Sequence, residues 1–407
     1  MKKTIKLAVV AALALGTTSA FATNGSNLIG MGAKTRGMAG TGIGMSHGAE
    51  SALVNPALIT SVEGTEISFG GTLFMPNVKN TNDIGAGGVS ADSDAKMNVI
   101  PEVSLATKVN DNFYWGVGMW GTAGMGTDYR SSKVIASGGT QMQMVTNLQL
   151  MQFGVPLAYT MEGVSVAVTP VLQYGALDIN YDSTGLPGGD KVGAGIAQDL
   201  KFGYNLGLSY QTSGITIGAT YKSQIDMEYQ GQLSNAMQAF GITGYTNDKL
   251  STPAEIGAGV SYAFDGNTIA IDYKQIQWSK AKGYEDFKWD DQNVISVGYE
   301  YATADWAARI GYNYAKSPIS EQSGFAGSTT APSSGLINTF NLLGFPAIVE
   351  SHYAIGATLN FSKTTSLDLA YTYAPEVSNT YTNFTGATNI TTKHSQTSAS
   401  AQLNYAF

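Results

Sequence analysis

The chain contains no cysteine, so it has neither a disulfide framework nor thiol chemistry nor a cysteine-ligated metal site. Charged side chains are also scarce, at 13% of the residues, whereas ordinary globular domains have roughly 25%. No apolar run reaches the about 20 residues that a helix needs to cross a bilayer. We therefore expect something other than water to cover much of the surface, without any membrane-spanning helix.

Basic residues are in the minority. When the N-terminal Lys2, Lys3 and Lys6 are set aside, 19 basic side chains face 30 acidic ones, a net charge of −11. This balance, without any basic patch, argues against nucleic acid as a partner. No grouping of His, Asp and Glu has the spacing of metal ligands, and we expect neither a metal nor a cofactor.

The first 22 residues have the pattern of an export signal. Three lysines accompany an apolar run from Leu7 to Leu15, and Ala20-Phe21-Ala22 is a small-x-small cleavage site. The sequence therefore predicts a cleaved signal peptide at 1–22 and a mature chain that begins at Thr23.

Alternation of apolar and polar residues is abundant in the remainder. Val297, Tyr299 and Tyr301, for example, alternate with small or polar residues, which is typical of strands that separate lipid from a lumen. Fourteen such segments lie near 65–75, 98–109, 112–121, 145–159, 163–175, 200–211, 214–230, 251–264, 267–279, 291–302, 304–316, 351–362, 365–376 and 394–407. Open sheet edges cannot face lipid, so we predict an all-β transmembrane barrel of 14 antiparallel strands in the bacterial outer membrane.

The connections between these segments alternate in length. Short turns, such as Ser213-Gly214 and Asp265-Gly266-Asn267, alternate with long polar or glycine-rich stretches. Short periplasmic turns and long extracellular loops are the rule in such barrels. A soluble β-sandwich also has many alternating strands, but it does not predict aromatic outer faces or this order of connections.

Residues 23–60 lack the period of a strand and are rich in glycine and methionine. Such a segment can fold into a confined space and repack around varied ligands, so we predict a hatch that plugs a barrel formed by residues 61–407. A flexible periplasmic tail, the alternative, would be more charged. The residues expected to characterise the hatch are Asn24, Leu28, Ile29, Met31, Met38, Asn55, Pro56 and Ala57.

Several motifs carry a resemblance to a known family. Thr23-Asn24-Gly25-Ser26-Asn27, Gly37-Met38-Ala39-Gly40 and Asn55-Pro56-Ala57 resemble the hatch of the FadL/TodX family of outer-membrane hydrophobic-compound transporters, and segments such as 309–314 and 345–350 are similar to its strands. The resemblance covers essentially the whole mature chain. It implies an external low-affinity groove, an internal high-affinity pocket, lateral exit through a kinked strand, and a monomer.

Transport of a hydrophobe requires a capture site, an internal site and an exit. Leu233, Met237 and Phe240 share one face at helical spacing in a predicted extracellular loop. They are expected either to form an outward-facing site that captures ligand or to form a satellite core that packs the loop.

Three basic residues are expected inside the barrel, namely Arg309, Lys274 and Lys201. A lipid-facing charge at the membrane midplane costs about 2 to 4 kcal/mol. These residues are candidate anchors for a fatty carboxylate, or else members of a lumen-wall ladder of ion pairs.

For the exit, glycines interrupt the third strand after Trp120, and glycine in a strand often marks a bend. The family resemblance implies a kink here that opens the barrel wall, with Trp120, Gly121 and Gly124 as the candidates. A plain loop that begins early is the alternative.

We expect passive uptake of hydrophobic compounds such as long-chain fatty acids, by loop capture, lumenal binding, hatch rearrangement and lateral exit. The alternatives are a general porin for polar solutes, a channel selective for aromatic hydrocarbons, and an adhesin. Gly44-Met45-Ser46-His47-Gly48 matches an esterase pattern, but it lies in the predicted hatch and not on a strand-to-helix turn, so we do not expect an enzyme. Expected partners are hydrophobic ligands or detergent, membrane lipid, lipopolysaccharide, and barrel-assembly machinery that reads Phe407.

Overall fold

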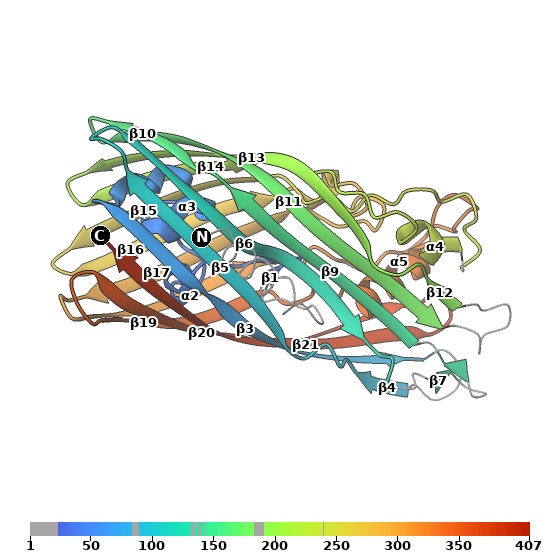
Figure 1. Ribbon diagram of the computed structural model, residues 1–407. Coiled ribbons are helices and arrows are strands. Elements are labelled where there is room, and N and C mark those ends of the chain that lie inside the picture. The colour runs from blue at the N-terminus through green and yellow to red at the C-terminus, as the bar shows by residue number, and fades with distance from the viewer. Residues whose placement is uncertain are drawn as a thin grey trace.

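The computed structural model describes residues 23–83, 89–131, 135–136, 140–141, 143–182, 191–238 and 240–407. The predicted signal peptide, 1–22, lies outside them. Within the described residues, fourteen antiparallel strands form a closed barrel around the N-terminal segment (Figure 1). The last strand pairs with the first along its whole length and closes the sheet. The prediction of a 14-stranded barrel closed around a hatch is confirmed.

The wall strands follow the chain in simple up-and-down order, and β9 and β10 form one strand that Val155 and Pro156 interrupt. The strands are β3 (Thr65–Asn82), β5 (Asn98–Lys108), β6 (Phe113–Asp128), β9 (Gln143–Gly154), β10 (Leu157–Met161), β11 (Val164–Asp182), β13 (Ala197–Thr212), β14 (Ile215–Lys222), β15 (Glu255–Phe264), β16 (Asn267–Ile276), β17 (Gln292–Ala302), β18 (Trp306–Ala315), β19 (Ser351–Asn360), β20 (Thr365–Thr382) and β21 (Asn389–Ala406).

The remaining elements belong to the hatch or to the loops. The hatch contains β1 (Thr23–Asn24), β2 (Asn27–Leu28), α2 (Ala33–Gly37), η1 (Gly48–Glu50), α3 (Ser51–Val54) and η2 (Pro56–Ser61). The loop elements are β4 (Val89–Asp92), β7 (Ile135–Ala136), β8 (Thr140–Gln141), β12 (Lys191–Gly193), α4 (Leu233–Gln238), η3 (Trp278–Lys280) and α5 (Ser334–Gly344). Among the described residues, no helix has both the length and the apolar character needed to cross a bilayer.

The alternation of side chains follows the predicted faces. On β17, Val297 and Tyr299 are exposed on the outer surface, whereas Ser296 is buried inside. A surface so rich in Val, Ile, Leu and Tyr is stable next to lipid and not next to water. The wall is uneven in height, since β14 has 8 residues and β18 has 10, but β20 and β21 have 18 each.

The ends of several strands differ from the prediction. β3, β11 and β20 run to Asn82, Asp182 and Thr382, six or seven residues past their predicted ends. β14 ends at Lys222 and not near residue 230, because the chain then leaves the wall and makes only isolated bridges, such as Ile225 with Thr252. β16 ends at Ile276 and is followed by a short 3-10 turn. β6 continues to Asp128 through its glycines, so no loop begins at residue 121.

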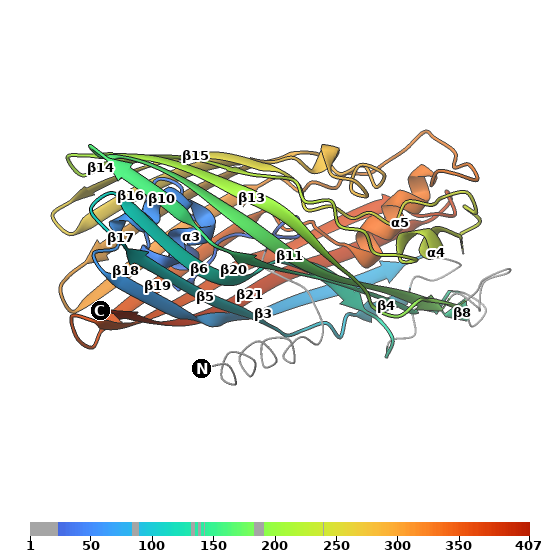
Figure 2. The same cartoon turned by 45° about the horizontal axis from the view of Figure 1, so that its top comes forward.

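Short turns and the C-terminus lie at one end of the barrel, and the long loops with α4 and α5 lie at the other (Figures 1 and 2). The hatch fills the interior toward the end with the short turns, where α2 packs against β19 and β20 and η2 against β11 and β13. The hatch therefore lies across the lumen at the end with the short turns.

Candidate functional site

The hatch rests on a row of small residues that runs across neighbouring strands. Gly218 pairs with Gly259, and Gly298 pairs with both Ala270 and Gly311. A Cβ atom on Gly218 would overlap the carbonyl of a hatch residue, and one on Gly311 would overlap hatch backbone as well. Glycine is required at these positions because the backbone of the hatch approaches the wall directly.

Asp272 of β16 fixes the hatch loop that follows α2. Its carboxylate accepts the backbone N–H groups of Gly42 and Ile43, both at 2.7 Å, and that of Gly44 at 3.3 Å. Asp272 is almost completely buried. Hydrogen bonds to a charged acceptor are the stronger kind, so this one side chain orders three consecutive residues of the hatch.

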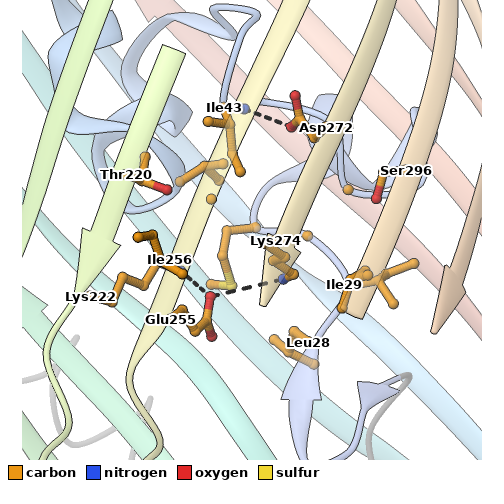
Figure 3. Close-up of a pocket in the computed structure, with 16 residues that line it drawn as sticks. Leu28, Ile29, Ile43, Thr220, Lys222, Glu255, Ile256, Asp272, Lys274 and Ser296 are labelled. Carbon is orange, nitrogen blue, oxygen red and sulfur yellow. Dashed lines mark hydrogen bonds and ion pairs between the residues drawn. The ribbon is translucent and has the colours of Figure 1, made fainter. Parts of the chain in front are cut away.

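A small cavity lies between the hatch and strands β14 to β17, and its volume is about 40 Å³. Its apolar lining includes Leu28 and Ile29 of the hatch and Ile256 of the wall, and Lys222 and Lys274 also line it (Figure 3). Ligand sites typically enclose about 300 to 1,000 Å³. A long hydrophobe therefore fits here only if the hatch moves.

Two lysines share one carboxylate at the rim of this cavity. The Nζ atoms of Lys222 and Lys274 lie 3.4 Å and 4.0 Å from Oε2 of Glu255, which stands between them in Figure 3. The other oxygen of Glu255 accepts the side-chain N–H of Asn27 in the hatch at 2.7 Å. Asp272 is the second acid at the cavity, but it is already occupied by three backbone N–H groups.

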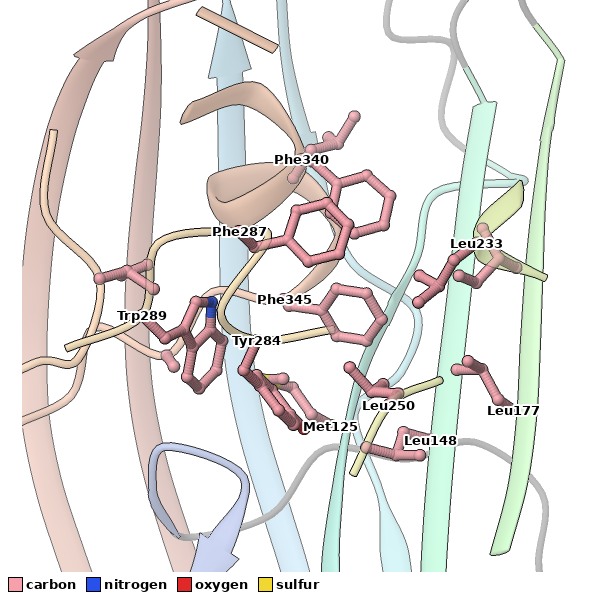
Figure 4. Close-up of a cluster of buried hydrophobic side chains, with 14 of the residues drawn as sticks. Met125, Leu148, Leu177, Leu233, Leu250, Tyr284, Phe287, Trp289, Phe340 and Phe345 are labelled. Carbon is pink, nitrogen blue, oxygen red and sulfur yellow. The ribbon is translucent and has the colours of Figure 1, made fainter. Parts of the chain in front are cut away.

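The lumen beyond this rim, toward the long loops, is filled by a large apolar cluster. Loop aromatics such as Phe287, Phe340 and Phe345 face aliphatic side chains that include Leu148 of β9 and Leu177 of β11 (Figure 4). Phe287 and Phe340 are stacked with ring centroids 4.6 Å apart. The apolar cluster reaches the cavity at Val294, which belongs to both, so apolar side chains meet a pair of cationic groups at the surface of the hatch.

The wall is interrupted beside the hatch. The ladder between β5 and β6 ends at the pair Glu102–Trp120, although β6 continues to Asp128. The ladder between β6 and β9 is irregular between Gly121 and Ala123. At this point, within the described residues, the edge of β6 meets the hatch and not β5, since Asn27 of β2 pairs with Ala123.

The indole of Trp120 lies on the inner face of the wall, packed in one cluster with hatch residues, and it donates a hydrogen bond to Ser104 at 2.8 Å. Gly124 donates its N–H to the carbonyl of Ser26 in the hatch. The three residues proposed from the sequence for the exit thus lie at the point where strand pairing passes from the wall to the hatch.

The three predicted anchors lie in different places. Lys274 lines the cavity. Arg309 is buried elsewhere, and its guanidinium donates to Glu300 at 2.6 Å and to Thr358 at 2.7 Å. Lys201 is on an inward-facing strand position, but its side chain is 45% exposed and its Nζ lies 3.5 Å from Asp199 near the loop end of β13. The structure therefore separates these residues and does not form a single basic site.

The predicted capture stripe is helical, but it does not face outward. Leu233 and Met237 of α4 are fully buried in the apolar cluster, and Phe240 packs against it with Tyr181 and Phe384. An outward-facing stripe is therefore wrong for Leu233 and Met237, because the loop folds back over the lumen. The alternative, packing of the loop, describes their position.

The predicted hatch residues are buried in the hatch or between the hatch and the wall, namely Asn24, Leu28, Ile29, Met31, Met38, Asn55, Pro56 and Ala57. Asn55 begins η2 by accepting the N–H of Ala57, and its own amide donates to the carbonyls of Ile43 and Leu208. The Asn-Pro-Ala motif therefore joins two parts of the hatch to β13.

The esterase-like pattern has no catalytic geometry. Ser46 donates to the carbonyl of Leu58, and the ring of His47 bonds to the carbonyl of Thr41. Both side chains instead hold turns of the hatch together.

Sequence reasoning missed Lys222, Glu255 and Asn27 as site residues. A two-residue turn joins β15 and β16, so the position of Glu255 near Lys274 follows from counting back along the hairpin. Nothing comparable in the sequence predicts that Lys222 lies beside Glu255, because a long loop separates β14 from β15.

Comparison with known proteins agrees with this architecture. A family profile described as "Outer membrane protein transport protein (OMPP1/FadL/TodX)" matches residues 8–326. The chain is 26% identical over 391 residues to a 47 kDa outer membrane protein of Pasteurella multocida, covering 84% of this chain and 86% of that protein. It is 21% identical over 447 residues to the long-chain fatty acid transport protein of Escherichia coli K12, covering 90% and 91%.

Two solved structures are similar in fold. The Pseudomonas putida toluene transporter TodX superimposes with a TM-score of 0.68 at 18% identity, covering 93% of this chain and 99% of that one. A Pseudomonas aeruginosa FadL homologue gives 0.67 at 15% identity, covering 94% and 100%. Because the family profile covers most of the chain, the protein belongs to the OMPP1/FadL/TodX family of outer-membrane transport proteins, which are transport channels and not enzymes.

Proposed function

We propose that the protein takes up hydrophobic compounds with a carboxylate head group, of the long-chain fatty acid class, by passive transport across the outer membrane. The observation that carries the proposal is the lysine pair, Lys222 and Lys274, at the rim of a cavity where the apolar cluster meets the hatch. Apolar side chains above a pair of cationic groups match an acyl tail above its carboxylate.

The energetics assign different tasks to the two parts of the site. Burial of each methylene contributes about 0.8 kcal/mol, so the eleven apolar carbons of laurate contribute about 9 kcal/mol before the costs of binding. The tail therefore provides most of the affinity. The lysines provide selection, because an uncharged alcohol or hydrocarbon of the same length leaves them paired with Glu255 alone.

The proposed route continues through the wall. A ligand at the lysines displaces the hatch, because the cavity of about 40 Å³ is too small for an acyl chain. The adjacent break between β5 and β6, which the hatch covers at Ala123 and Gly124, then gives the ligand a lateral way into the membrane.

Relatives point to two substrate classes. The name of the Escherichia coli protein assigns long-chain fatty acids to it, and that of the Pseudomonas putida protein assigns toluene. The lysine pair favours the acid for this chain, since toluene has no group that interacts with an ammonium-lined rim through charge.

Binding to protein in lipid nanodiscs tests the proposal without competition from detergent. The measured quantity is the displacement of a fluorescent fatty acid by laurate or by dodecanol. Wild type is compared with the double variant Lys222→Met and Lys274→Met. Arg309→Met is the control, because Arg309 is a buried cation outside the cavity. We expect about ten-fold weaker laurate binding in the double variant, unchanged dodecanol binding, and no change for the control.

Two results would contradict the proposal. Equal loss of laurate and dodecanol would show that the lysines shape the site and do not select the acid. Absence of binding by any hydrophobe, together with swelling of protein-containing liposomes in sugar solutions, would indicate a general porin.

A further inference from the structure

The neighbourhood of Glu255 suggests how an acid, and not simply any hydrophobe, releases the hatch. Glu255 is the first residue of β15, and its side chain is only 11% exposed. It accepts from Asn27 at 2.7 Å and lies near both lysines. A carboxylate of the protein therefore occupies the position between the lysines that a fatty carboxylate would take.

Asn27 connects this carboxylate to the interrupted wall. Its Cα is the partner of Ala123 on β6, and the carbonyl of the preceding Ser26 accepts the N–H of Gly124 at 3.1 Å. The β1–β2 hairpin, residues 23–28, is thus held by Glu255 on one side and by the edge of β6 on the other.

Within the part of the chain that the structure describes, few other polar contacts hold this hairpin against the wall and loops. The hydroxyl of Ser26 lies 3.3 Å from that of Tyr284, and Gly25 lies against the ring of Trp278. Among these contacts of the hairpin, the hydrogen bond from the Asn27 side chain to Glu255 is the one that involves an ionised group of the wall. Loss of that bond removes a charge-assisted contact from a segment of only six residues.

We propose that Glu255 is a built-in competitor for anionic ligands and that its displacement from the lysines releases the hairpin from β6. This inference rests on the proposed function and adds a specificity-determining residue to it. An incoming carboxylate forms ion pairs with the two ammonium groups, and repulsion between like charges displaces the carboxylate of Glu255. The Asn27 contact is lost, and the edge of β6 is uncovered. A neutral hydrophobe leaves Glu255 and its bond to Asn27 in place, so it binds among the apolar side chains of the cluster without releasing the hairpin.

Glu255→Gln separates charge from shape. The amide oxygen of glutamine still accepts the hydrogen bond from Asn27. The neutral side chain, however, no longer forms ion pairs with Lys222 and Lys274. We expect laurate to bind about ten-fold more tightly to this variant than to wild type, and dodecanol to bind equally to both. Asp199→Asn is the matched control, because Asp199 also pairs with a lysine, Lys201, but outside this cavity.

Hydrogen exchange in nanodiscs measures the release itself. In wild type, saturating laurate is expected to speed exchange of residues 23–28 and of Gly124, whose N–H bonds to the hairpin, by about ten-fold, whereas dodecanol leaves it unchanged. In Glu255→Gln, laurate binds without this acceleration. Heat-modifiable migration on gels confirms that each variant forms a closed barrel.

The outcomes distinguish the two proposals. If wild type binds no laurate, the proposed function fails. If wild type binds laurate, but Glu255→Gln binds it no more tightly or dodecanol loosens the hairpin equally, the role of Glu255 is overturned while the proposed function stands. Faster exchange with laurate in wild type, abolished in Glu255→Gln, supports it.

Discussion

Replacement of Asp272 by asparagine tests how firmly the wall holds the hatch. The carboxylate accepts three backbone N–H groups from consecutive hatch residues, two at 2.7 Å and one at 3.3 Å. Asparagine has one acceptor oxygen in place of two. When the asparagine oxygen takes the place of the carboxylate oxygen that accepts from Gly42 and Ile43, both bonds remain, but their acceptor is no longer charged. The amide N–H₂ group then faces the N–H of Gly44, and that bond is lost.

The magnitude follows from these bonds. A bond to a charged acceptor contributes about 1 kcal/mol more than a neutral one, and the lost third bond contributes about 1 kcal/mol. Asp272→Asn therefore costs about 3 kcal/mol in the docking of the loop. Because a factor of ten corresponds to about 1.4 kcal/mol, local opening becomes about 100-fold more frequent.

Hydrogen exchange followed by mass spectrometry measures this opening. The amides of Gly42, Ile43 and Gly44 are expected to exchange about 100-fold faster in Asp272→Asn than in wild type. Asp368→Asn is the control, since Asp368 is equally buried but pairs with Lys34 at another part of the hatch. Unchanged exchange of the three amides in Asp272→Asn would refute the reasoning, because the loop would then be held by packing alone.

Two further perturbations act on the hatch. In Gly311→Val the new side chain overlaps the backbone of Met38, so we expect limited proteolysis to cleave the hatch while the barrel remains folded. The lipid-facing control Ala308→Val should stay resistant. Equal resistance of both variants would contradict a direct contact between the hatch backbone and the wall. Burial lowers the pKa of the His47 imidazole from 6.5 to about 3. A depressed pKa gives stability that is complete above pH 6.5 and is lost as the pH falls toward 3; protease sensitivity of the hatch should rise from pH 7.5 to pH 5.5, and His47→Gln should abolish the difference.

The architecture was predictable from the sequence because a barrel wall repeats one simple pattern. The outer face of β17, with Val297 and Tyr299, follows directly from a period of two residues, and so does the inward position of Lys274. The hairpin turns fix which strands are neighbours. These local signals are strong, since a lipid-facing charge or a register shift is costly at every strand.

The site was less predictable because periodicity gives the face of a residue and not its depth or partners. Arg309 and Lys274 have the same inward signature, yet one is bonded to Glu300 and the other lines the cavity. The long loop before β15 hides the proximity of Lys222 and Glu255. The stripe that contains Leu233 was read correctly as a helix, but the direction of its apolar face depends on how the loop folds over the lumen.

The uneven height of the barrel has a consequence for the proposed uptake of hydrophobes. β20 has 8 more residues than β18, and at about 3.3 Å per residue and a tilt near 45° this raises one side by about 19 Å. A bilayer crossing takes only about 9 to 11 residues of strand. The tall side therefore extends beyond the hydrocarbon, and the apolar cluster lies on its inner surface. Under the proposed function, a hydrophobe that arrives from the water would meet the apolar cluster on this tall side before it reaches the hydrocarbon of the membrane.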